Sequence, residues 1–200
     1  MKILSTLVII TCLPFITLAQ LKEVNANDSL TAELTQKDTS YWVYNLREFR
    51  DAIYQQNKAK AKLFADFPIM NENNEIWYLA YRFSGKLIEK LPKDIKPFTE
   101  QDFDKYFEEI FTPYFVKCFL KIKTDELYKK GSFTTVDLLD SVNSRCYYMS
   151  ATVISQTNTI ELMLNSKPKN PDDDFELSVG YFIDINKQGH LKLKKVRVAG

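Results

Sequence analysis

The clearest feature of the chain is a change in the period of its apolar positions near Gly131. Before this point apolar residues recur three and four positions apart, as Leu46, Phe49 and Ile53 do, which is typical of the buried face of a helix. From Ser132 onward apolar and polar residues alternate, which indicates half-buried strands. Helices followed by a sheet predict an α+β fold.

The stretch Tyr44–Met70 is predicted to form two helices and the start of a strand. We expect Asn45 to cap the first helix, with Glu48 three residues later returning its carboxylate to the cap. A short second helix is predicted over Lys58–Phe64. The proline within Phe67–Ile69 disfavours helix and pushes the residue before it toward extended geometry, so a strand is expected there.

Residues 76–83, IWYLAYRF, fit two interpretations. Their aromatic content and length suit a strand, but Trp77, Tyr81 and Ile88 are also spaced to line one face of a helix. We favour a strand, followed by a loop that contains two prolines.

Three further helical segments are predicted before the sheet. Thr99 has the position of a cap, and Asp102 can return its carboxylate to it, ahead of an apolar helical face over residues 103–111. Pro113 marks a kink or a new helix. A last helix is expected over Thr124–Lys130, ended by the glycine that follows it.

Alternation predicts four strands, and a fifth is less clearly marked over Phe133–Leu139. The four are Cys146–Ser155, Thr159–Asn165, Phe175–Ile185 and Leu191–Val198. Their short connections predict antiparallel pairing between neighbours. In the last strand the apolar phase slips near Lys194 and Lys195, which predicts one extra residue, a β-bulge that bends the sheet.

Residues 1–19 have the pattern of a secretory signal peptide. Lys2 precedes the apolar run Ile3–Phe15, and Thr17-Leu18-Ala19 forms a suitable cleavage site before Gln20. The run is short for a bilayer span, so we expect no membrane span after cleavage. The protein is therefore predicted to be exported, either periplasmic or secreted.

The mature chain is predicted to begin with a flexible leader over residues 20–40, which are polar and lack aromatic residues. Residues 41–200 are then expected to form a single domain. A lipid anchor at Cys12 is not favoured, because Thr11 is a poor residue before a lipidated cysteine and the segment after it is too apolar for a tether.

Composition supports a packed core and argues against nucleic acid as a partner. Apolar residues make up 45 % of the chain and aromatic residues 14 %. Cleavage after residue 19 removes Lys2, which lowers the 27 basic residues by one to match the 26 acidic ones. A chain without net charge lacks the basic footprint that nucleic-acid binding requires.

Cys118 and Cys146 are the two cysteines that remain after cleavage, and in an exported protein they suggest a disulfide. Such a bridge would close a loop of roughly 28 residues and stabilise the fold by about 3–4 kcal/mol. The alternative is a pair of buried thiols that serve as small apolar groups.

Recognisable catalytic and metal-binding motifs are missing from the sequence. His190 is the single histidine and follows a hairpin turn, so no histidine pair is available for a metal. We find no nucleophile elbow, Walker loop or dinucleotide fingerprint. Asp172–Asp174 lack the spacing of a calcium loop and are interpreted as a solvated connection between strands. No metal and no cofactor are expected.

Three segments together resemble a known family: FPI at residues 67–69, FTEQDFDKYFEEIF at 98–111, and YFIDINKQGHLKLKKVRVAG at 181–200. The chain is similar over Tyr44–Gly200 to exported Gram-negative bacterial domains of unknown function with the NTF2-like, or cystatin-like, α+β cone fold. The resemblance implies that the N-terminal helices pack on the concave face of a strongly bent antiparallel sheet. It brings no catalytic residue that could be assigned here.

Such a cone can enclose a pocket. The candidate lining residues are aromatic: Tyr181, Tyr148, Tyr147, Trp77 and Phe49. The alternative is that these aromatic side chains simply pack the core and the sheet.

Three functions follow as hypotheses. The first is an exported, non-catalytic binding module that holds an unknown small apolar ligand or protein partner in the cone or on the sheet face. The second is an NTF2-like isomerase or hydrolase that uses an unrecognised carboxylate. The third is a periplasmic inhibitor or immunity-type protein that acts through a loop such as Lys167–Asp174. The sequence leaves the oligomeric state open.

Overall fold

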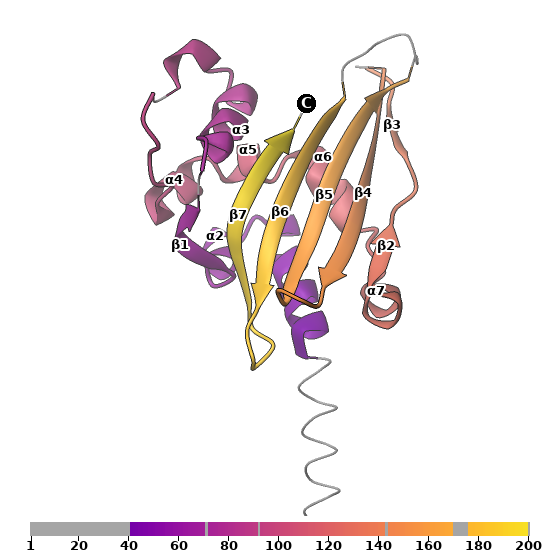
Figure 1. Ribbon diagram of the computed structural model, residues 1–200. Coiled ribbons are helices and arrows are strands. Elements are labelled where there is room, and N and C mark those ends of the chain that lie inside the picture. The colour runs from indigo at the N-terminus through magenta and orange to yellow at the C-terminus, as the bar shows by residue number, and fades with distance from the viewer. Residues whose placement is uncertain (1–40, 71, 92, 143, 170–175, 200) are drawn as a thin grey trace, which may run out of the picture.

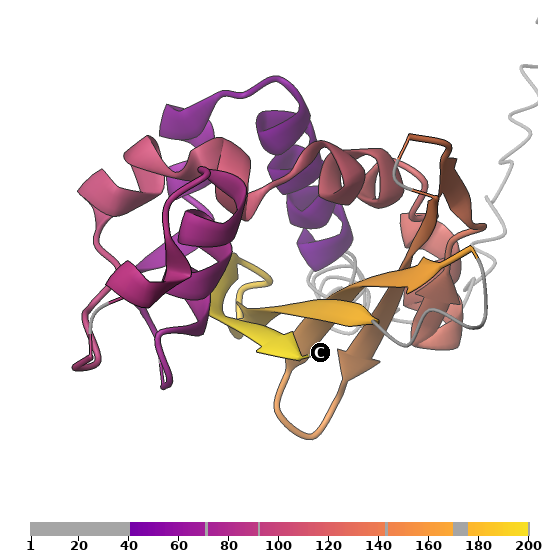
Figure 2. The same ribbon diagram turned by 90° about the horizontal axis from the view of Figure 1, so that it is seen from above.

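The computed structural model describes residues 41–70, 72–91, 93–142, 144–169 and 176–199. Over these residues the fold is α+β: seven strands form one mixed sheet, and the main helices lie on one of its faces (Figures 1 and 2). The predicted signal peptide, the leader, Cys12 and Asp172–Asp174 lie outside the described residues. No helix in the described part is long and apolar enough to span a membrane.

The elements follow one another with the helices first. The order is a helix described over residues 41–54, α2 (Lys58–Lys62), β1 (Ala65–Met70), α3 (Glu75–Phe83), the 3₁₀ turn η1 (Ile88–Lys90), α4 (Glu100–Lys105), α5 (Phe107–Ile110), α6 (Pro113–Phe119), α7 (Thr124–Lys130), β2 (Ser132–Thr134), β3 (Leu138–Asp140), β4 (Arg145–Ile154), β5 (Thr159–Pro168), β6 (Leu177–Ile185) and β7 (Leu191–Ala199).

The strand order is β1-β7-β6-β5-β4-β2, and β3 also pairs with β4. Neighbouring strands are antiparallel except for β1, which runs parallel to β7. The prediction of a wholly antiparallel sheet is therefore wrong at this edge. Short connections force antiparallel pairing, but residues 71–190 separate β1 from β7, so no turn constrains their relative direction.

Alternation along β6 places one set of side chains under the helices and the other on the open face. Val179, Tyr181 and Ile183 are buried, whereas Phe182 and Asp184 between and beside them are half-exposed. A sheet that is covered on one face needs this period-two pattern. The pattern is why β4–β7 are the elements that the sequence predicts best.

The predicted bulge in β7 is confirmed. Phe182 pairs with Lys195 and the next residue of β6, Ile183, pairs with Leu193, so Lys194 is the extra residue. Its ammonium group forms an ion pair with Asp66 of β1. The inserted residue restores the buried phase for Val196.

Asn45 is not the cap of the first helix, because residues 41–44 before it are already helical. It is buried instead, and its Nδ2 donates a hydrogen bond to the carbonyl of Gly189, at 2.9 Å. This bond holds the β6–β7 turn against the helix.

Residues 76–83 form a helix and not the strand that we favoured. The buried positions Ile76, Trp77, Leu79 and Ala80 follow helical spacing. Asn74 starts the segment in the left-handed conformation, with φ of 57°. The aromatic content of the segment imitates a strand, but packing against α5 and β7 decides in favour of the helix.

The helical starts at Thr99 and Pro113 are confirmed. Thr99 and Asp102 exchange the two bonds of a capping box. Thr112 accepts a hydrogen bond from the backbone N–H of Phe115, and Pro113 occupies the first turn of α6. Gly131 ends α7 in the left-handed conformation, as predicted.

The contact between the β6–β7 turn and the first helix makes Gly189 sensitive to substitution. Gly189 has φ of +76°, and a Cβ there would lie 3.0 Å from Cβ of Tyr41 and 3.1 Å from the backbone nitrogen of Trp42. We expect Gly189→Ala to lower the free energy of unfolding by about 2–4 kcal/mol, from left-handed strain plus overpacking.

Urea unfolding measures the effect of Gly189→Ala, and Gly131→Ala is the matched control. Gly131 has φ of +73°, and a methyl group there would meet no heavy atom within 4 Å beyond its chain neighbours. This variant should lose only the strain contribution, about 1–2 kcal/mol. Equal losses in the two variants would show that the turn does not press on the helix.

Candidate ligand-binding site

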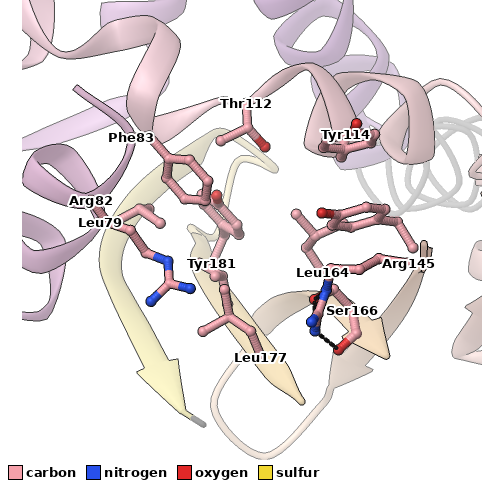
Figure 3. A pocket seen from close by; sticks show the side chains of 12 residues that line it. Leu79, Arg82, Phe83, Thr112, Tyr114, Arg145, Leu164, Ser166, Leu177 and Tyr181 are labelled. Atoms are coloured by element: carbon pink, nitrogen blue, oxygen red, sulfur yellow. Dashed lines mark hydrogen bonds between the residues drawn. The ribbon is translucent and has the colours of Figure 1, made fainter. Parts of the chain in front are cut away.

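A cavity of about 130 Å³ lies between the helices and the covered face of the sheet (Figure 3). It is lined by residues of α3, of the start of α6 and of three strands: Leu79, Arg82, Phe83, Thr112, Tyr114, Arg145, Tyr147, Leu164, Ser166, Leu177, Val179 and Tyr181. A cavity of roughly this size accommodates one benzene-sized group.

Tyr181 forms a fixed wall of the cavity. Its ring packs against Phe111 and Phe115, with centroids 6.0 and 4.3 Å away, and its hydroxyl donates to the carbonyl of Ile110 at 2.6 Å. Complete burial raises the pKa of its phenol far above the usual range. Since its proton is committed to a backbone carbonyl, Tyr181 is suited to shaping the cavity and not to proton transfer.

A pair of stacked tyrosines forms the opposite wall. Tyr114 of α6 and Tyr147 of β4 lie with ring centroids 3.9 Å apart and planes inclined by 5°. The hydroxyl of Tyr114 donates to Asp140 Oδ2 at 2.5 Å, and the backbone N–H of Val142 donates to Asp140 Oδ1 at 3.0 Å. The stack therefore anchors α6 to β3 and β4.

Two arginines reach the cavity from different elements. Arg82 of α3 donates to the hydroxyl of Tyr78 at 2.7 Å, and Arg145 of β4 donates to Ser166 Oγ at 2.8 Å. Figure 3 shows Arg82 and Arg145 on opposite sides of the cavity, with Leu177 between them. Each side chain is half-buried.

Charged side chains around the cavity affect the pKa of the Tyr147 phenol. Partial burial raises the pKa of its phenol, and the negative charge of Asp140 adds to the rise, whereas the positive charges of Arg145 and Arg82 oppose it. The phenol is therefore neutral at physiological pH and lies in the combined field of two guanidinium groups and one carboxylate.

The lining is apolar with cationic and hydroxyl groups. Among its described residues there is no carboxylate, histidine or thiol. The described ranges of the chain also contain no cluster of three metal-ligating side chains. The arrangement can hold an apolar group and can place positive charge beside it.

Two of the five predicted pocket residues, Tyr181 and Tyr147, line this cavity. Trp77 lies elsewhere on α3, where it packs against Phe98 and donates Nε1–H to a loop carbonyl, that of Lys96, at 2.8 Å.

The other two predicted residues are also outside the lining. Phe49 packs in the core against Phe64, Phe111 and Phe119. Tyr148 follows a residue that faces the helices, so strand alternation puts it on the open face, where the ammonium group of Lys167 lies 5.3 Å from its ring centroid.

Sequence reasoning missed the α3 residues of the site. Leu79, Arg82 and Phe83 are spaced by three and four positions, so a helical interpretation of this segment would have placed them on one face. The strand interpretation separated them. No sequence signal connected α3 with Arg145.

The expected disulfide does not form in the structure, where Cys118 and Cys146 are both free thiols. Cys118 is buried on α6 beneath the covered face of the sheet. Cys146 precedes Tyr147, which faces the helices, so it points to the opposite face of β4. The sheet separates the two sulfur atoms.

Comparisons with protein-family models, with curated proteins and with solved structures find no match for this chain. The geometry and chemistry of the cavity are therefore what supports an assignment of function.

The buried hydrogen bond of Tyr181 predicts a measurable loss of stability. Tyr181→Phe should lower the free energy of unfolding by about 1–3 kcal/mol, because it leaves the Ile110 carbonyl without its partner in the core. Tyr128→Phe, at a ring that is 44 % exposed, is the control and should change it by less than about 0.5 kcal/mol. Similar urea midpoints for both variants would contradict the role of this bond.

The cysteines should differ in reactivity. Burial raises the pKa of the Cys118 thiol to about 11, so at pH 8 it is almost wholly protonated as well as inaccessible. Alkylation of the native, unreduced protein should label Cys146 and spare Cys118, and labelling after unfolding in urea should reach both. Peptide mass spectrometry identifies each labelled site. Detection of a disulfide-linked Cys118–Cys146 peptide would contradict this prediction and show that the disulfide expected from the sequence forms.

Proposed function

We propose that this protein is an exported binding module that holds a small, largely apolar ligand in the cavity between α3, α6 and β4–β6. The observation that supports it most directly is the cavity itself: about 130 Å³, bounded by Leu79, Leu164, Leu177 and Val179 together with aromatic rings. Binding pockets are typically concave, mostly apolar and equipped with a few polar groups. Export is proposed from the signal-like pattern of residues 1–19.

The proposal includes an NTF2-like arrangement, with helices packed inside a bent sheet. The helices on one face of the sheet and the cavity beneath them support it (Figure 2). The extra residue Lys194 in β7 also supports it, because a bulge bends the strand that contains it. The parallel pairing of β1 departs from the expected antiparallel sheet.

Binding is favoured over an isomerase or hydrolase by the state of the hydroxyl groups. Tyr181 and Tyr114 donate their protons to Ile110 and Asp140. Asp140 is a carboxylate bonded to the lining, but it is not itself among the described residues that line the cavity. A general base needs to reach the substrate directly or through one water.

The inhibitor hypothesis depends on a loop that the structure describes only in part. Of Lys167–Asp174, residues 170–174 lie outside the described ranges. The described end of this connection shows Lys167 paired with Asp137 at 3.0 Å. The cavity therefore favours the binding module over the inhibitor.

A substitution that fills the cavity with a larger side chain tests the binding function. One-ring aromatic compounds, screened with the full chain by ligand-detected NMR, should bind at about millimolar Kd or tighter, as the small number of contact atoms allows. Leu177→Trp should weaken the binding at least tenfold, because the larger ring occupies the space between the arginines.

Thr152→Trp is the matched control, since Thr152 is exposed on the open face of the same sheet. It should bind the compounds as the unmodified chain does. Absence of binding to the unmodified chain, or equal binding by the Leu177→Trp variant, would overturn the proposed function.

A further inference from the structure

We propose that the corner of the molecule formed by the end of α3 and the turn η1 docks on an anionic lipid membrane. Its apolar tip consists of Phe83, Leu87 and Ile88. Figure 1 shows the connection between α3 and α4 at the upper left of the molecule, away from β4 and β5. The inference adds a partner to the proposed function and does not depend on it, because binding to vesicles is measured without a ligand.

The apolar tip exposes three large apolar side chains within six residues. Phe83 is 47 % exposed, Leu87 58 % and Ile88 37 %. Exposed apolar residues scattered singly are ordinary on a protein surface, whereas contiguous ones mark sites of interaction with proteins or membranes. The tip is therefore a surface that a partner would cover.

Backbone hydrogen bonds hold the segment that presents the tip. Gly85, which follows α3, has φ of +71°, and the N–H of Lys86 donates to the carbonyl of Tyr81 at 3.2 Å. Within η1 the N–H of Lys90 donates to the carbonyl of Leu87 at 3.0 Å. A surface whose backbone is already ordered loses less conformational entropy when it docks.

Two lysines beside the tip are available to lipid headgroups. Lys90 and Lys93 are exposed, and neither ammonium group has a hydrogen bond or an ion pair with any residue that the structure describes. The connection over residues 84–97 contains four lysines against Glu89 and Asp94, so its net charge is +2. This charge complements an anionic membrane surface.

The other two lysines of the connection fix it to the core. The ammonium group of Lys86 donates to the hydroxyl of Tyr106 and lies 4.6 Å from the centroid of that ring. The ammonium group of Lys96 lies 4.5 Å from the ring centroid of Trp77. Aromatic rings attract a cation without neutralising it, so both lysines still contribute positive charge at this corner.

The combination of exposed apolar side chains with lysines favours a membrane over a protein partner. Lysine is depleted at protein–protein interfaces. At a membrane surface, apolar side chains enter the boundary between headgroups and acyl chains, while lysines stay among the anionic headgroups. Lipid therefore satisfies both kinds of side chain that this corner exposes.

Phe83 connects the apolar tip with the cavity. Its side chain lines the cavity and is also 47 % exposed, so the cavity reaches the surface at this residue. Figure 3 shows Phe83 beside Leu79 on the α3 side of the cavity. In the docked orientation the cavity opens toward the lipid, and an apolar ligand can enter it without crossing water.

Sedimentation with vesicles tests the docking. The full chain, purified after export, is mixed with vesicles of phosphatidylcholine alone or with roughly one third phosphatidylglycerol. Binding to the anionic vesicles should be at least about tenfold tighter and should weaken as salt is added, because the lysine contribution is screened. Absence of binding to the anionic vesicles, which a protein partner at this corner would also give, would overturn the proposal.

Variants assign the binding to the corner. Leu87→Glu should weaken it at least about tenfold, because it removes an apolar side chain and adds negative charge. Leu63→Glu, at a side chain that is 68 % exposed after α2, is the matched control and should stay within about twofold. Equal binding by these two variants would refute the assignment to the tip.

A second pair of variants tests the lysines. The double variant Lys90→Gln with Lys93→Gln should bind about tenfold more weakly and show a smaller salt dependence. Lys129→Gln with Lys187→Gln removes the same charge from exposed positions elsewhere and is the control. Equal losses in the two double variants would show that net charge alone drives the binding and would overturn the docking at this corner.

Binding of one-ring aromatic compounds, measured by NMR on the same samples, separates this inference from the proposed function. Vesicle binding without binding of the compounds would overturn the proposed function and leave the docking. Binding of the compounds without vesicle binding would do the reverse. Leu87→Glu should keep its affinity for the compounds, which also shows that the variant is folded.

Discussion

The hydrogen bond from the Tyr181 hydroxyl to the Ile110 carbonyl links the two layers of the molecule. Ile110 ends α5, and a carbonyl at a helix end has no partner within the helix. In the aromatic core, the partner of this carbonyl is the hydroxyl of Tyr181, in the middle of β6. Tyr181 also packs against Phe111 and Phe115, on either side of the break between α5 and α6. The sheet thus determines where the helical layer turns, and that turn positions Thr112 and Tyr114 at the cavity.

The same one-sided packing explains the open face. Every strand from β4 to β7 sends alternate side chains away from the helices, and those of β7 are mainly cationic. Lys195 and Arg197 both pair with Glu72, which follows β1, and their hydrogen bonds, supported by their positive charges, lower the pKa of that carboxyl. Lys194, the bulged residue, pairs with Asp66 within β1. The basic residues of β7 therefore lie along its junction with β1. Exposed ion pairs at this junction contribute little to the stability of the fold, but they match the charges of the two strands.

Local rules predicted what depends on local contacts. The capping box at Thr99, the helix start at Pro113, the bulge near Lys194 and the four long strands each follow from a few adjacent residues. The errors arose where distant contacts decide. Residues 76–83 form a helix because their buried face packs against α5 and β7. Strand β1 runs parallel to β7 because the two strands are far apart in the sequence and no short turn joins them. In the site, alternation was enough to find Tyr181 and Tyr147. Arg82 could not be found without the correct form of α3, and its proximity to Arg145 depends on how α3 docks on the sheet.

That docking rests on contacts remote from the cavity. The indole of Trp77 packs against Phe98 and Tyr106 and donates to Lys96, and the Asn74 side chain donates to Asp94, so the base of α3 is held by the loop before α4. None of these contacts requires a cation in the last turn of α3. Apolar side chains at the positions of Arg82 and Arg145 would satisfy a packed core better than half-buried guanidinium groups do, because removing charge from water is costly. Departures of this kind from what packing favours concentrate at functional sites. The fold therefore accounts for the tyrosines of the cavity, and hydrogen bonds to Tyr78 and Ser166 offset part of the cost of half-burying its two guanidinium groups.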